Sequence, residues 1–173
     1  MPSSPQEKMR AEPNAGAGRS ADDLRLQLAL TAGLECVNNG DAAGALAHLK
    51  PVEPLAAARE NASYVFGLFH FNIGQTQQAL EWFDRALRLK PDFPDALAAR
   101  AVALQKLGHT QDALAALEAI LRIDPGNHEA LYMSGVIHQS LDHWQEALAA
   151  YDHALAQKPD YCEALTNRGV LLE

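Results

Sequence analysis

Apolar residues recur at helical spacing along most of the chain, and short polar breaks interrupt them at regular intervals. Three stretches show this most clearly: ALEWFDRALRLKPDFPDAL, ALAALEAILRIDPGNHEAL and ALAAYDHALAQKPDYCEAL. In each, an apolar-periodic run ends before a proline, a polar turn follows, and an acidic residue opens the next run. Proline cannot extend the helix that precedes it. The pattern predicts an internal repeat, because Pro91, Pro125 and Pro159 lie 34 residues apart.

Each repeat contains a second break, at NIGQTQ, KLGHTQ and SLDHWQ. Gly74 and Gly108 hold the same place in the first two units, where a left-handed helix cap favours glycine, and Asp142 holds it in the third. Each unit is therefore predicted to form two antiparallel helices. The predicted units are 60–93, 94–127 and 128–161.

Four places in the unit follow a pattern of small and bulky residues. The first place is a small residue in the first helix. The second helix has the other three: an alanine near its start, a bulky residue four places later, and then another small residue. The sets are Gly67, Ala101 and Gly135; Ala79, Ala113 and Ala147; Phe83, Leu117 and Tyr151; and Ala86, Ile120 and Ala154. The pattern resembles the tetratricopeptide repeat (TPR) family over residues 60–173, with Ile120 as a departure. The resemblance implies an all-α fold, a right-handed α-solenoid (superhelix) of antiparallel helix pairs in 34-residue repeats.

Both flanks depart from the full pattern. Residues 23–59 are interpreted as a degenerate TPR-like helix pair, distorted where Pro51 and Pro54 interrupt the expected second helix. Residues 162–173 match only a first helix, so we expect the start of a further, truncated repeat, or else a capping helix. Residues 1–22 mix Pro, Gly, Ser and charge, and they are predicted to be a disordered tail.

Composition supports helices and narrows the class of partner. Of the 173 residues, 48% are hydrophobic and 6% aromatic, which suits close-packed helices better than a β-sandwich. The net charge of -8 disfavours nucleic acid and anionic membranes, because both require a basic face. We expect a protein or peptide partner, apolar with basic residues. Cys36 and Cys162 lack a partner motif, and no apolar run approaches the roughly 18 residues of a membrane helix, so a cytoplasmic location is expected.

No convergent set of catalytic or metal-binding residues can be assembled from the sequence. His70 and His138 fall at equivalent first-helix places and are interpreted as packing residues, since there is neither an HExxH motif nor a Cys/His cluster. The stretch GAGRS lacks the spacing of a phosphate loop. We expect no enzyme activity within these residues, no cofactor and no metal.

The resemblance also implies where a ligand would bind. In the family, the first helix of each unit lines the concave wall, and its second, fifth, sixth, ninth and twelfth places face a groove. Carried onto this chain, these places predict an apolar groove with aromatic and acidic edges. We call it the groove, and its predicted peptide-binding residues are Tyr64, Val65, Leu68, Phe71, Asp95, Ala99, Val102, Glu129, Tyr132, Met133, Val136, Glu163 and Asn167.

Two features of the groove have alternative interpretations. Asp95, Glu129 and Glu163 recur at one place; they either complement the helix macrodipole, at about 0.3–1 kcal/mol each, or steer ligands that carry Lys or Arg. The aromatic residues either bind a partner or pack against neighbouring helices. The Lys, Asn and Arg residues with which some family members hold a terminal carboxylate are absent at the matching places.

Three functions are compatible with this sequence. The favoured one is a non-catalytic protein–protein interaction scaffold that binds a peptide or partner helix in the groove. One alternative is the substrate-recruiting arm of a longer enzyme, because EALTNRG resembles TPR arrays fused to bacterial glycosyltransferases. The other is self-assembly through the apolar carboxy-terminal helix near Leu172.

Overall fold

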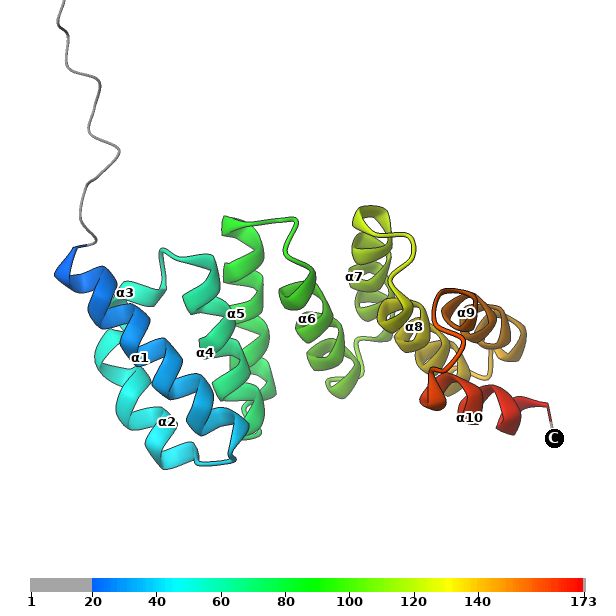
Figure 1. The fold of residues 1–173 in the computed structure, drawn as a ribbon, viewed down its shortest axis with the longest axis horizontal. Coiled ribbons are helices and arrows are strands. Elements are labelled where there is room, and N and C mark those ends of the chain that lie inside the picture. Colours follow the sequence, from blue (N-terminus) through cyan, green and yellow to red (C-terminus); the bar gives the residue numbers. More distant parts are fainter. Residues whose placement is uncertain (1–19, 173) are drawn as a thin grey trace, which may run out of the picture.

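The structure, a computed structural model, describes residues 20–172, and its helices stack in pairs along one long axis (Figure 1). The regular pairs are α4 (Glu60–Asn72) with α5 (Thr76–Leu89), α6 (Pro94–Lys106) with α7 (Thr110–Ile123), and α8 (His128–Ser140) with α9 (Trp144–Gln157); α10 (Cys162–Leu171) follows them. The first helices of successive pairs begin in the 34-residue register predicted from the prolines. The fold is an α-solenoid.

The turn inside each regular pair depends on one residue in the left-handed region. Gly74 and Gly108 have φ values of 80° and 81°, and Asp142 has a φ of 59°. An aspartate tolerates this conformation better than most residues because its side chain is short and polar. The reversal closes with backbone hydrogen bonds, as where the N–H of Gly74 donates to the carbonyl of Phe71 at 3.1 Å.

The two helices of a pair approach closely at the small residue of the first helix. A Cβ atom on Gly67 would lie 2.3 Å from the ring of Phe83, and one on Gly135 would lie 2.5 Å from the ring of Tyr151. Both rings are buried. The remaining apolar surface is covered by the next pair, because the second helix of each pair packs against the first helix of the following one.

The first unit is irregular. Its elements are α1 (Ala21–Asn38), α2 (Ala42–Leu49), a 3₁₀ helix η1 (Lys50–Val52) and the short α3 (Glu53–Ala56). Pro51 and Pro54 lie in the first turns of η1 and α3, where the missing N–H removes no helical hydrogen bond. As a result, α1 packs directly against α4, and this contact is more extensive than the one between the first helices α4 and α6 of the following units.

Most of the predicted tail, 1–22, lies outside the described residues, as does Glu173. Ala21 and Asp22 were expected in that tail but belong to α1. The reason is a capping box: Asp23 N–H donates to Ser20 Oγ at 3.1 Å, and Ser20 N–H donates to the Asp23 carboxylate at 3.3 Å. These bonds start the helix before the expected boundary.

Candidate peptide-binding groove

An aromatic cluster forms the amino-terminal part of the groove. Tyr64, Leu68 and Phe71 lie on one face of α4, because residues three and four apart share a helix face. With Ala99 of α6 they pack, partly exposed, around the buried ring of Phe83. The structure therefore brings together four of the predicted groove residues, and each keeps part of its surface free.

The ring of Tyr64 is held from two sides. Its centroid lies 6.1 Å from that of Phe83 and 5.3 Å from that of Phe93, which precedes α6. Further along α4, the Nζ atom of Lys106 lies 4.9 Å from the centre of the Phe71 ring, in a cation–π contact. These contacts restrict both rings, so a ligand would meet a largely preformed surface.

The prediction for Val65 was wrong. It is only 8% exposed and belongs to the core cluster that joins α4 to the first unit, which includes Leu26 and Phe66. The reason is the irregular first joint, since α1 lies directly against α4 and covers this side chain. Val65 therefore supports the groove from behind and offers no contact surface to a ligand.

A second cluster, of tyrosines, forms the carboxy-terminal part of the groove. The ring of Tyr132 on α8 lies 5.9 Å from that of Tyr151 and 5.1 Å from that of Tyr161, centre to centre. Asn167 of α10 donates from Nδ2 to the Tyr132 hydroxyl at 3.2 Å. The Tyr151 hydroxyl donates to Oε1 of Gln139 at 2.7 Å. This network fixes Tyr132 and Asn167, both predicted groove residues, relative to each other.

Smaller residues separate the two aromatic clusters. Val102 of α6 is 37% exposed and is the most open apolar residue of the predicted set. Met133 and Val136 of α8 are half-buried, and Met133 packs partly against the core shared by α6, α7 and α8. The middle of the groove is therefore shallow and aliphatic, whereas its ends are aromatic.

Acidic residues flank both aromatic clusters. Asp95, Glu129 and Glu163 are exposed in the first turns of α6, α8 and α10, which agrees with the macrodipole interpretation. Burial, followed by the Asp95 carboxylate, raises the pKa of Tyr64. Burial also raises the pKa of Tyr161, with further contributions from the carboxylates of Glu163 and Glu129. The negative potential of these carboxylates thus reaches both aromatic clusters.

Sequence reasoning missed two aromatic residues that form these clusters. Phe93 and Tyr161 both lie two residues after a turn proline, in equivalent places of their repeats. Each supports a groove tyrosine, and each has a lysine Nζ 5.0 Å from its ring centre, Lys90 and Lys158 respectively. Their shared register was a usable signal. Both residues lie in the turn before the first helix of a unit, outside the helix places that the family pattern assigns to the groove.

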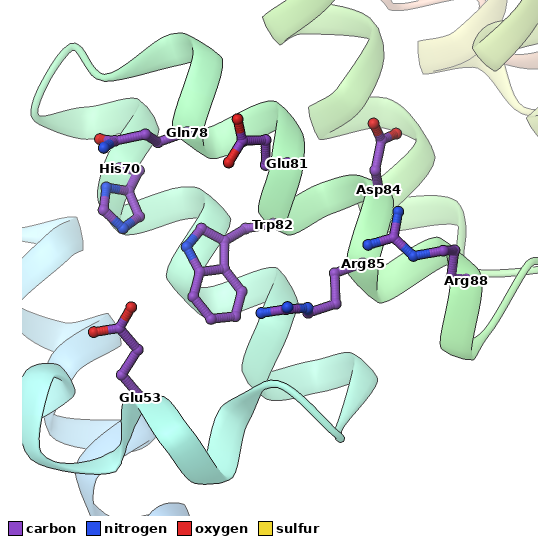
Figure 2. A pocket seen from close by; sticks show the side chains of 8 residues that line it. All are labelled: Glu53, His70, Gln78, Glu81, Trp82, Asp84, Arg85 and Arg88. Atoms are coloured by element: carbon purple, nitrogen blue, oxygen red, sulfur yellow. The ribbon is translucent and has the colours of Figure 1, made fainter.

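A hollow of about 470 Å³ lies away from the groove, between α3, α4 and α5. Figure 2 shows Trp82 in its centre, with His70 and Arg85 on either side and Glu53 reaching from α3. The Trp82 ring packs 4.8 Å from that of Phe66, and the Arg85 guanidinium lies 4.9 Å from the Trp82 ring centre. The charges around this hollow are of both signs.

The hollow follows from the broken helix of the first unit. Ala116 and Ala150 hold the register of Trp82 in the next two units. The interrupted helix contributes Glu53 to the lining of the hollow around the larger indole of Trp82. This feature depends on the path of the interrupted helix, which the sequence pattern does not specify.

The described residues contain no group of three or more side chains that could hold a metal ion. His70 places Nδ1 2.6 Å from Oε1 of Gln75, and its ring lies against Phe69. Cys36 and Cys162 are both free thiols. Among residues 20–172 we find no helical segment with the length and apolar character that a membrane span requires.

The stacked helix pairs define the class of the protein, an α-solenoid built from helical repeats. The family model described as "Psidin, N-terminal TPR repeats region" matches residues 69–168, more than half of the chain. The chain belongs to the tetratricopeptide repeat family. A search of curated proteins gave no match.

Solved structures of other TPR proteins have a similar fold. MamA (residues 41 to the end) from Desulfovibrio magneticus RS-1 is 22% identical, with a TM-score of 0.76 over 89% of this chain and 85% of that chain. YrrB, described as a TPR protein with an unusual peptide-binding site, is 23% identical, with a TM-score of 0.74 over 83% of this chain and 74% of that chain. At these identities the likeness shows the fold.

Proposed function

We propose that the protein is a non-catalytic interaction scaffold that binds an apolar peptide or partner helix, carrying basic residues, in the groove. The supporting observation is the row of partly exposed apolar side chains between two fixed aromatic clusters. The row begins with an aromatic section around Tyr64, continues with an aliphatic section around Val102, and ends with an aromatic section around Tyr132. Contiguous apolar surface of this kind is characteristic of interaction sites.

The acidic residues support the expected charge of the ligand. Asp95, Glu129 and Glu163 form no ion pair among residues 20–172, so their carboxylates are available to a partner. Exposed charges at the rim of an interface mainly raise the association rate and depend on salt. A basic residue beside an apolar anchor is therefore the ligand pattern that fits best.

A test uses an array of helical and extended peptides that combine Leu, Phe or Met with Lys or Arg. The best binder is titrated against Val102→Arg, which places a charge in the middle of the groove without touching the buried core. We expect affinity about tenfold lower or worse. Ile123→Arg is the matched control, since Ile123 is 43% exposed on α7 and lies outside the groove. Equal affinity in both variants would contradict the proposal.

Self-association is a second candidate function. Leu165 and Val170 of α10 and Leu172 at its carboxy-terminal cap are 48%, 60% and 59% exposed, so three large apolar side chains near this helix are open to solvent. We expect Leu165→Glu together with Leu172→Glu to abolish any dimer seen by light scattering over a concentration series. A wild-type mass that stays monomeric at high concentration would exclude this function.

A further inference from the structure

We call the contact between the second helix of one pair and the first helix of the next pair a joint. Two of these joints contain the same kind of ion pair. At the joint of α5 and α6, Arg100 Nε donates to Oδ1 of Asp84 at 2.7 Å. At the joint of α9 and α10, Arg168 Nε donates to Oδ1 of Asp152 at 2.5 Å. Asp84 and Asp152 are two repeats apart, as are Arg100 and Arg168, so the two joints repeat one arrangement.

The joint between them, of α7 and α8, lacks this ion pair. One repeat after Asp84 and Arg100 come Glu118 and Ser134. The acidic residue is retained, but serine carries no charge and is too short to reach across the joint. Glu118 consequently has no ion-pair partner in the part of the chain that the structure describes.

A cavity of about 370 Å³ opens at this joint, between α7, α8 and the start of α9. Glu118 and Ser134 line it, together with His138, His143 and aliphatic side chains that include Leu114 and Leu121. The His138 ring lines the cavity and lies 5.9 Å from the His143 ring, centre to centre, and its Nδ1 is buried with no hydrogen-bond partner among residues 20–172. A buried polar atom without a partner is costly, so a ligand that bonds to it gains affinity.

The cavity lies on the side of α8 away from the groove. Successive residues of a helix are 100° apart, so Ser134 and His138 project nearly opposite to Tyr132 and Val136. Figure 1 shows α7 and α8 next to each other along the solenoid, and the cavity is formed at that contact. A ligand here would not compete with one in the groove.

We propose that this cavity binds an arginine side chain of a partner protein. Its guanidinium takes the place that Arg100 and Arg168 occupy at the neighbouring joints and donates to the Glu118 carboxylate. A further N–H donates to Nδ1 of His138 once the imidazole ring turns this buried atom toward the cavity, and the aliphatic wall covers the methylene groups of the arginine side chain.

Guanidinium suits this site better than other cations do. It is planar and presents five donors in a fixed arrangement, so one group can bond to both a carboxylate and an imidazole nitrogen. An ammonium group is a compact, strongly hydrated charge and would lose more hydration on entry. The net charge of -8 also favours the approach of a cationic partner.

The test is a titration with the blocked peptide acetyl-Gly-Arg-Gly-amide, followed by NMR signals of the His138 and His143 rings. We expect a saturable shift of the His138 signals with a dissociation constant on the order of millimolar, because a single side chain makes few contacts. The lysine peptide of the same length should bind about fivefold more weakly or worse. Equal binding of both peptides would overturn the guanidinium assignment.

Two variants separate the site from general changes in the protein. Glu118→Gln removes the carboxylate charge at an exposed position and should lower affinity about tenfold. Ser134→Arg supplies the missing arginine within the chain and should abolish the shift, with folding checked by circular dichroism. Glu146→Gln, an exposed change on α9 outside the cavity, is the matched control and should bind as wild type. Unchanged binding in Glu118→Gln would overturn the proposal.

A third ligand, free L-arginine, identifies the source of the guanidinium group. Free L-arginine carries the same guanidinium with a charged amine and carboxylate instead of a peptide chain. Tighter binding of free arginine than of the blocked peptide would assign the cavity to a small molecule and overturn the proposal of a protein partner. Weaker or equal binding supports it.

Discussion

The middle helix pair differs from the two pairs that flank it in how the contact between its helices is filled. In the α4/α5 and α8/α9 pairs, a glycine on the first helix faces a buried aromatic ring on the second, Phe83 or Tyr151. In the α6/α7 pair, Ala101 and Leu117 hold these places, and both are buried. A larger side chain on one helix is thus matched by a smaller one on the other, as close packing requires.

This exchange has consequences on both sides of the solenoid. In the flanking pairs the buried ring supports a tyrosine on the groove, Tyr64 on Phe83 and Tyr132 on Tyr151. The middle pair has Ala98 in that place, so its part of the groove lacks an aromatic residue. One repeat framework can therefore vary its ligand-facing surface through the residue that fills its interior.

The largest effect is expected from Gly67→Ala. The new Cβ would lie 2.3 Å from the ring of Phe83, which is itself fixed by Tyr64. Overpacking of this kind costs about 1–3 kcal/mol, and the better helix propensity of alanine offsets at most about 1 kcal/mol. We expect a net loss of about 1–2 kcal/mol in the free energy of unfolding, measured by urea denaturation.

The double variant Gly67→Ala with Phe83→Leu sharpens this test, because it copies the alanine and leucine of the middle pair. Its loss should be smaller than the sum of the single losses, since the leucine leaves room for the Cβ. Gly169→Ala is the control: a Cβ there meets nothing within 4 Å, so stability should stay equal or rise. Strict additivity in the double variant would show that the two packings are not interchangeable.

The next largest effect is expected from Tyr151→Phe. The ring is buried and its hydroxyl donates to Gln139 at 2.7 Å, so its removal should cost about 1 kcal/mol. It also removes an acceptor of Asn167 and should loosen Tyr132 in the groove. Tyr161→Phe serves as comparison, because no described residue bonds to that hydroxyl, and a change near zero is expected. Urea unfolding of both variants measures the difference.

Alkaline pH should destabilise the flanking parts of the solenoid, which contain tyrosines, more than the middle helix pair. Burial is the main cause that raises the pKa of Tyr64, Tyr151 and Tyr161 above the ordinary value of about 10. As the pH rises, the tyrosines of the unfolded chain therefore lose their protons before those of the folded protein. The stability that the three protonated tyrosines contribute is complete below about pH 10, and it is lost as the pH rises through their pKa values in the folded protein. The middle pair contains no tyrosine.

Urea unfolding at a series of pH values above neutrality measures this loss. Tyr64→Phe removes one of the three groups and should reduce the slope of stability against pH above about pH 9. His109→Gln, an exposed change in the turn of the middle pair, should leave the slope as in the wild type. A slope that is the same in wild type and Tyr64→Phe would contradict the role assigned to this half-buried tyrosine.

The helix register and much of the groove could be predicted from the sequence, because prolines and small residues mark the repeat and helical spacing then places each side chain. Tyr64, Leu68, Phe71 and Ala99 lie together for that reason. Val65 was placed wrongly because its burial depends on how α1 meets α4. That joint follows from the broken helix at Pro51, and no repeat pattern describes it.

The ion pairs between helix pairs were harder to predict from the sequence than the helix register and the groove. Asp84 and Arg100 are in register with Asp152 and Arg168, but a register alone does not show that two helices bring these groups within hydrogen-bond distance. Once that distance is known for two joints, the missing arginine at Ser134 becomes visible in the sequence. The cavity beside it depends on side-chain packing alone.

The smallest changes in stability are expected when the arginine of one joint and the serine of the other are exchanged. Arg100→Ser copies the middle joint at α5/α6, and Ser134→Arg copies the flanking joints at α7/α8. The existing pairs are partly exposed, with Arg100 at 28% and Asp84 at 38%, so each exchange should change stability by about 0.2–1 kcal/mol, downward for Arg100→Ser and upward for Ser134→Arg. Urea unfolding at low salt measures both changes.

Salt distinguishes an ion pair from a packing effect in these two variants. At about 1 M NaCl the screening length falls to about 3 Å, so both differences from wild type should shrink if they arise from charge. A loss of more than about 1 kcal/mol in Ser134→Arg at either salt concentration would mean that an arginine side chain cannot enter the joint without displacing Leu114 or Leu121. The middle joint would then differ from its neighbours in shape as well as in charge, and the cavity would be unable to accept an arginine from a partner.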